Sequence, residues 1–142
     1  MQVFLSYARE DEAFASTLAQ DLKSQRANIW IDLNDAPVDN KQQWLAAVEA
    51  ALAESDILLV VMSQAAAQQS YIQNDWHFFM QHDRPVLVAL SERCDIPPDL
   101  KHADTIDFSS SYESGLHRLQ FRMIEYATRL AGSKWHRRPS HG

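Results

Sequence analysis

Residues 70–76 read SYIQNDW and place an aromatic side chain and a carboxylate four residues apart. On a helix, Tyr71 and Asp75 would share one face. Tyr71 could then stack on a flat ring while Asp75 stabilises positive charge that develops beside it. The structural alternative is that Asp75 complements the helix dipole and Tyr71 packs against a neighbour. The choice depends on what the fold places in front of this face.

Other catalytic and binding motifs do not occur in this sequence. The three glycines, Gly115, Gly132 and Gly142, cannot form a Walker A loop or a dinucleotide fingerprint, because both need glycines for close backbone approach. No nucleophile elbow of the esterase kind is present. His77 and His82 are five residues apart, and the six histidines include no i, i+4 pair or nearby cysteine for a metal. We therefore expect neither a metal nor a cofactor.

The composition indicates one globular domain. The chain has 142 residues, 46% of them hydrophobic, which is enough for a single core. A net charge of −6 argues against a nucleic-acid binder, which would carry a basic surface. The single cysteine, Cys94, excludes an internal disulfide and fits a reducing cytoplasm. The apolar runs are too short for a secretory leader or a membrane span, so we expect a cytoplasmic protein without a membrane partner.

Apolar runs alternate with amphipathic stretches along the chain. The run DILLVVM is apolar throughout, as expected for a strand covered on both faces. Apolar residues at every third or fourth position predict helices over 11–25, around Trp44 to Leu52, over 65–81, and from Leu116 to a stop at Gly132. The predicted strands are 3–7, 28–32, 56–62, 84–90 and 104–108.

This alternation predicts an α/β fold, a flavodoxin-like doubly wound sheet of five parallel strands in the order 2-1-3-4-5 with helices on both faces. Ligands of such folds bind beyond the carboxyl ends of the strands. The segments to examine are therefore 6–9, 32–41, 63 onward and 91–95. We expect one domain over 1–131, followed by a basic tail over 132–142 that acts as a linker or chain end.

Several stretches resemble, in the right order, the motifs of bacterial-type TIR (Toll/interleukin receptor) domains. VFLSYAREDEAFASTLAQDL is similar to their first strand, which runs into Ser-Tyr and a charged turn. IWIDLNDAPVDNKQQW is similar to the second strand, which ends in aspartate and leads through the BB loop to a helix with a tryptophan. SYIQNDW takes the place of an aromatic residue, three others and a glutamate. ALAESDILLVVMS, RPVLVAL and TIDFSSSYESGLHRL resemble the remaining strands, so the similarity covers roughly residues 1–130.

The resemblance implies a function. TIR domains are self-associating signalling modules, and a subset cleaves NAD as glycohydrolases or cyclases with the helix glutamate as catalytic residue. It implies a signalling domain that cleaves the nicotinamide–ribose bond of NAD when assembled. NAD would be the substrate, and the partners would be further copies of the chain or other TIR domains.

The resemblance also implies roles for individual residues. Asp75 would stabilise the ribosyl cation, Tyr71 would stack on a ring, and Arg9 would neutralise phosphate. The other implied positions are Ser6, Tyr7 and Asp32 for substrate binding, and Asp35, Pro37, Asn40 and Lys41 for the interaction loop.

The chain departs from the family pattern at two places. Asp75 is one methylene shorter than glutamate, and a carboxylate misplaced by about 1 Å can cost about 100-fold in rate. Asn40-Lys41 stand where many members carry glycine. A non-catalytic module that acts by homotypic TIR–TIR association is therefore the second hypothesis. Structural roles also stay open for Asp32, in local loop bonds, and for Ser6 and Ser63, in satisfying backbone groups at strand ends.

Overall fold

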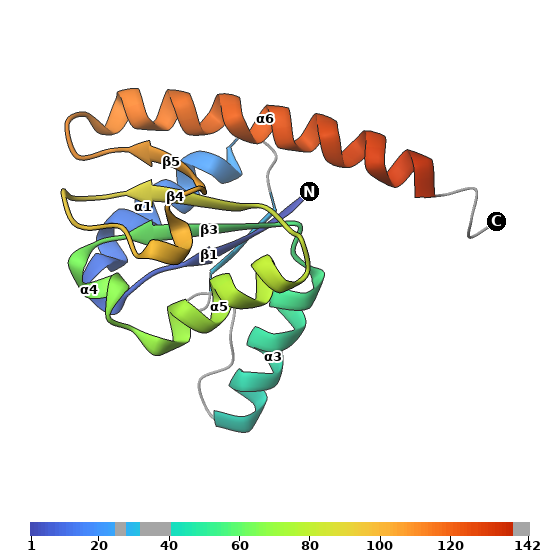
Figure 1. Ribbon diagram of the computed structural model, residues 1–142, viewed down its shortest axis with the longest axis horizontal. Helices are drawn as coiled ribbons and strands as arrows, with labels where there is room; N and C mark the ends of the chain where they lie inside the picture. The colour runs from blue at the N-terminus through green and yellow to red at the C-terminus, as the bar shows by residue number, and fades with distance from the viewer. Residues whose placement is uncertain (25–27, 32–40, 138–142) are drawn as a thin grey trace.

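The computed structural model describes residues 1–24, 28–31 and 41–137, with the backbone alone for 41–43 and 132–137. It contains one sheet of five parallel strands in the order β2-β1-β3-β4-β5 (Figure 1). The predicted fold class and strand order are therefore confirmed. The strands are β1 Gln2–Ser6, β2 Asn28–Ile31, β3 Ile57–Met62, β4 Val86–Leu90 and β5 Asp104–Asp107.

Helices cover both faces of the sheet (Figure 1). One face packs against α1 and α6, and the other packs against α3, α4 and α5. The α-helices of the described residues are α1 Glu12–Lys23, α3 Lys41–Glu54, α4 Gln64–Ala67, α5 Ser70–Gln81 and α6 Tyr112–Arg137, and the short 3-10 helices are η1 Arg9–Asp11 and η2 Pro98–Leu100.

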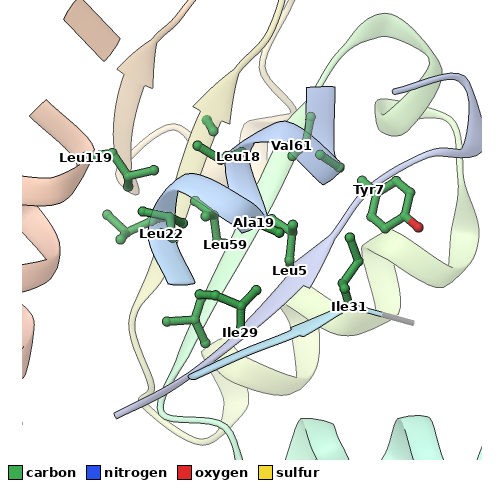
Figure 2. Close-up of a cluster of buried hydrophobic side chains, with 14 of the residues drawn as sticks. Leu5, Tyr7, Leu18, Ala19, Leu22, Ile29, Ile31, Leu59, Val61 and Leu119 are labelled. Carbon is green, nitrogen blue, oxygen red and sulfur yellow. The ribbon is translucent and has the colours of Figure 1, made fainter. Parts of the chain in front are cut away.

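Alternating side chains divide the core into two clusters. In β1, Val3 and Leu5 face α1, whereas Phe4 faces the opposite cluster. This is the period of two that a pleated strand imposes. Figure 2 shows the cluster beneath α1, where Leu5 lies with Leu18 and other apolar side chains. All six residues of β3 are buried, since both of its faces are covered.

Two predicted helix boundaries are wrong. The stretch 65–81 forms two helices: α4, which the side chain of Ser63 caps at its start and which ends at Ala67, and α5, which begins at Ser70. The last helix does not stop at Gly132 but continues to Arg137. A glycine inside a helix costs only about 1 kcal/mol relative to alanine, so it need not end one. The domain boundary at 131 stays a prediction. No helix in the described ranges combines the length and apolarity that crossing a membrane requires.

Two tyrosine hydroxyls attach α6 to the rest of the domain. Tyr112 donates a hydrogen bond to Asp21 of α1, and Tyr126 donates one to Asp104 of β5, each at 2.5 Å. Burial, together with the bond to Asp104, raises the pKa of Tyr126 from 10 to about 12. The neutral phenol is thus the form that the folded chain stabilises.

Replacing Tyr126 by phenylalanine tests this attachment. Loss of a hydrogen bond to a charged acceptor should lower the free energy of unfolding by roughly 1–2 kcal/mol near neutral pH. Because the folded pKa is raised, the native bond contributes fully below pH 10 and is lost as pH rises towards about 12. Urea unfolding at several pH values should therefore show a smaller alkaline loss for the variant. Equal stability at neutral pH would contradict the account.

The contact between α6 and Phe108, the residue that follows β5, depends on a glycine. A Cβ added at Gly115 would lie 2.6 Å from the ring of Phe108, which is only 4% exposed. That ring packs against Phe14 and Tyr112, so it has little room to move. Gly115→Ala should therefore destabilise the fold by about 1–3 kcal/mol despite the better helix propensity of alanine. Denaturant unfolding measures the loss, with exposed Ser114→Ala as control. A stabilised Gly115→Ala variant would show that the helix is not closely packed here.

Candidate functional site

The strand order locates the ligand edge of the sheet. From β1 the chain crosses to β2 on one side, whereas β3 continues towards β4 on the other. The carboxyl ends of β1 and β3 therefore form the switch point at which doubly wound folds bind ligands. Ser6 is the last residue of β1, and Ser63 directly follows β3.

Ser6 and Asp75 meet at this edge. The Ser6 hydroxyl donates to Oδ2 of Asp75 at 2.9 Å, although the two residues are 69 positions apart. Pleating explains the contact, because Ser6 follows Phe4 by two residues and so points to the face that α5 covers. Asp75 is half-buried, whereas Ser6 is 3% exposed. The sequence prediction that Asp75 lies on a helix is confirmed.

Packing of α5 determines which way Asp75 faces. Ile72, Trp76 and Phe79 are buried against the sheet. With these residues inside, Asp75 lies at the margin of the buried stripe, next to the end of β1. Tyr71, one turn earlier, is 44% exposed.

Tyr71 makes a second contact with the end of β1. Its hydroxyl donates to the backbone carbonyl of Tyr7 at 3.2 Å. The ring of Tyr7 points to the opposite face and joins the cluster beneath α1 (Figure 2). Tyr71 and Asp75 therefore share one face of α5, as their spacing predicted, and they contact consecutive residues of the other segment. The half-exposed Tyr71 ring offers a flat apolar surface beside the carboxylate.

The segment after β1 is also tied to α4. Asp11 Oδ2 accepts a hydrogen bond from the Ser63 hydroxyl at 2.5 Å, while Ser63 Oγ accepts one from Ala66 N at 3.1 Å and caps α4. The interpretation that Ser63 satisfies a backbone group is therefore confirmed. Burial, reinforced by nearby Glu92, raises the pKa of Asp11 despite the bond from Ser63.

The role of Asp11 was not predicted from the sequence. A serine three residues before a helical amide is the usual N-cap signal, but it does not say what else the serine contacts. Arg9 itself lies in η1 and is exposed, two residues before Asp11. The structure therefore brings Ser6, Tyr7, Tyr71 and Asp75 together, and it places Arg9 on the same connecting segment.

A hollow of about 410 Å³ opens on the same edge of the sheet, after β3 and β4. It supplies Arg93, a guanidinium that sequence analysis did not single out. Burial and the acids Glu92, Asp95 and Asp11 raise the pKa of Cys94, which favours the protonated thiol in this hollow. The lining residues are Gln64, Ala67, Gln68, Arg93, Cys94 and Asp95.

The described side chains offer no metal site. Within the described ranges no three His, Cys, Asp or Glu side chains gather closely enough to hold an ion. His77 pairs with Asp99 at 2.9 Å on the surface, and His82 bonds to the carbonyl of Phe78. Both histidines therefore have local partners on or beside α5.

Part of the predicted site lies outside the described residues. Asp32, Asp35, Pro37 and Asn40 fall in 32–40, and for Lys41 only the backbone, at the start of α3, is described. Their implied roles in substrate binding and association stay predictions.

The comparison with protein families gives a match over most of the chain. The family model described as TIR domain matches residues 3–120. The chain belongs to the TIR domain family. The resemblance drawn from the strand-end motifs is thereby confirmed, although a bacterial type is not specifically indicated. No curated protein sequence matches the chain.

Solved structures agree on the fold. The TIR domain of the Toll-related receptor TRR-2 from Hydra magnipapillata has a TM-score of 0.73 and 21% identity, covering 87% of this chain and 97% of that one. A 2-deoxyribosyltransferase from Bacillus psychrosaccharolyticus has a TM-score of 0.65 and 10% identity, covering 77% and 86%. A conserved protein from Enterococcus faecalis has a TM-score of 0.64 and 11% identity, covering 86% and 98%. At these identities the likeness establishes the fold alone.

Asp11→Asn tests the network around Ser63. Asparagine keeps an oxygen that can accept from Ser63 but removes the charge that burial and Glu92 disfavour. The pKa of Asp11 is raised in the folded chain. Its carboxyl therefore stabilises the fold at pH values below 3.8, its ordinary pKa, and this stabilisation is lost as pH rises through the folded pKa. The variant should therefore lose less stability than the native chain as pH rises above 3.8, measured by urea unfolding. Parallel pH profiles for the two chains would contradict the shift.

Proposed function

We propose that this TIR domain cleaves the nicotinamide–ribose bond of NAD, with Asp75 as the catalytic carboxylate. The observation that carries the proposal is the Ser6–Asp75 contact at the switch point. It puts a half-buried carboxylate on a rigid helix at the edge where folds of this class bind ligands. The TIR domain family supports the same assignment by resemblance, because Asp75 stands in the place of the family's catalytic glutamate.

The chemistry requires little more than this arrangement. Nicotinamide in NAD is already a cationic leaving group, and its departure leaves an oxocarbenium-like ribose. A carboxylate held close to that carbon stabilises the developing charge and can hold the ribose hydroxyls. The half-exposed ring of Tyr71, one turn from Asp75, is available to stack on a flat group, and exposed Arg9 is available to phosphate.

One structural neighbour is compatible with chemistry of this kind on this fold. The protein from Bacillus psychrosaccharolyticus is described as a 2-deoxyribosyltransferase and has a TM-score of 0.65. Its 10% identity relates the two chains by fold only. The neighbour therefore indicates that an enzyme can be built on this fold, and it carries no information about the residues of this chain.

The second candidate is a binding module that acts by homotypic association. Two features of Asp75 favour this candidate. Aspartate is shorter than the glutamate that it replaces, and Oδ2 of Asp75 already accepts a hydrogen bond from Ser6 within the fold. On this account the Ser6–Asp75 contact serves only to hold α5 against β1. The exposed apolar side chains Phe121 and Ile124 of α6, 66% and 62% exposed, are surfaces that such a module could use.

Nicotinamide release from NAD separates the two candidates. Asp75→Ala should abolish release by the assembled domain, because it removes the charge that stabilises the ribosyl cation. Asp75→Glu should raise the rate roughly 10-fold or more by moving the carboxylate about 1 Å further out. The matched control is Asp83→Asn, the same loss of charge at the far end of α5, where a φ of 54° suits asparagine. Equal release by Asp75→Ala and the native chain would overturn the enzyme proposal. Light scattering on each sample establishes assembly, and an assembled native chain that releases nothing would favour the binding module.

A further inference from the structure

The hydroxyl of Ser6 is directed into the protein. Ser6 is 3% exposed, and its Oγ donates to Asp75 Oδ2 at 2.9 Å. A buried hydroxyl in this position has little surface to offer a substrate. It instead makes a hydrogen bond to a carboxyl oxygen, and such a bond to an ionised carboxylate is roughly twice as strong as a bond between neutral groups.

The segment that carries Ser6 is fixed on two sides. Towards α5, the Tyr7 carbonyl accepts a bond from Tyr71, one helical turn from Asp75. Towards α4, Asp11 accepts a bond from Ser63. Residues 6–11 are therefore attached to both helices that follow β3, so a donor on this segment holds its position relative to α5.

A catalytic role for Asp75 requires that its carboxylate be held in one orientation, which a carboxylate on the surface of a helix does not need. The last torsion of an aspartate side chain is broad and roughly two-fold, so the backbone alone does not orient its carboxylate. A catalytic carboxylate must be held within a fraction of an ångström of its working position, because misplacement by about 1 Å can cost about 100-fold. The bond from Ser6 restricts the torsions of Asp75 and brings its Oδ2 towards the end of β1.

We propose that Ser6 is a positioning residue that orients the carboxylate of Asp75 for cleavage, in place of the substrate contact that the family resemblance implies. The inference rests on the proposed function. In this pair, the hydroxyl of Ser6 at the end of β1 is the donor that holds the carboxylate of Asp75 on α5.

The pair has a kinetic consequence. Ser6→Ala removes the donor without touching the substrate-binding side chains, so kcat should fall by roughly 10- to 100-fold while KM changes little. Ser6→Thr keeps the hydroxyl and should recover most of the rate. A direct substrate contact at Ser6 would instead raise KM in the alanine variant.

The matched control is Ser55→Ala. Ser55 is 1% exposed and its hydroxyl is also hydrogen-bonded inside the fold: it donates to the carbonyl of Ala51 and accepts from the side-chain amide of Gln2. It precedes β3 and so lies at the amino edge of the sheet, opposite the site. The variant makes the same chemical change at similar burial. Comparable stability with undiminished kcat would show that losing a buried hydroxyl does not by itself lower the rate.

The experiment combines steady-state nicotinamide release with NMR scalar couplings across the Cα–Cβ bond of Asp75 in the native chain, Ser6→Ala, Ser6→Thr and Ser55→Ala. We expect one Asp75 rotamer in the native, threonine and control chains, and averaged couplings with lowered kcat in Ser6→Ala. Unchanged couplings in Ser6→Ala would overturn the positioning role whatever the rates, as would a rise in KM with kcat unchanged. One outcome would refute the proposed function alone: the native chain releases no nicotinamide, and Asp75 has a single rotamer in the native chain but averaged couplings in Ser6→Ala. The orientation of Asp75 by Ser6 would then stand as a structural feature.

Discussion

The central constraint on this domain is the burial of β3 on both faces. All six residues from Ile57 to Met62 are inaccessible, and their side chains divide between two apolar clusters. Helices must therefore cover each face, and the chain must cross over the sheet between successive parallel strands. Because every strand runs in the same direction, all polar residues that follow the strands are delivered to one edge. The candidate site exists at that edge as a consequence of how the core is built.

Pleating and helix packing then determine which side chains meet at the edge. The period of two sends Ser6 to the face of α5 and the ring of Tyr7 to the face of α1. Burial of Ile72, Trp76 and Phe79 places the neighbouring Asp75 against the end of β1. The carboxylate is thus held by the same packing that stabilises the domain. A site built on a strand end and a packed helix is more rigid than one built on loops, as catalysis by orientation requires.

The sequence predicted the fold class, the strand order and the shared face of Tyr71 and Asp75, because these follow from apolar periodicity and helical spacing. It did not predict the pairing of Ser6 with Asp75 or of Ser63 with Asp11. The first contact depends on where α5 lies along the sheet edge, and α5 begins only after a break at Ala67, where periodicity suggested one continuous helix. The second joins the end of β3 to the segment that follows β1. Nor did Gly132 end α6, since a glycine can be tolerated inside a helix and is not itself a stop. Local patterns predict elements well, whereas contacts between distant side chains require the assembled core.

The most direct test of the account is an NMR titration of the assembled domain with NAD, following the backbone amides of the residues at the carboxyl edge. The account predicts saturable shifts centred on Ser6, Tyr7, Tyr71 and Asp75, with amides at the opposite edge around Ser55 unchanged. Shifts confined to other surfaces such as α6, or none at concentrations far above those of cellular NAD, would contradict the claim that this edge of the sheet is a nucleotide site.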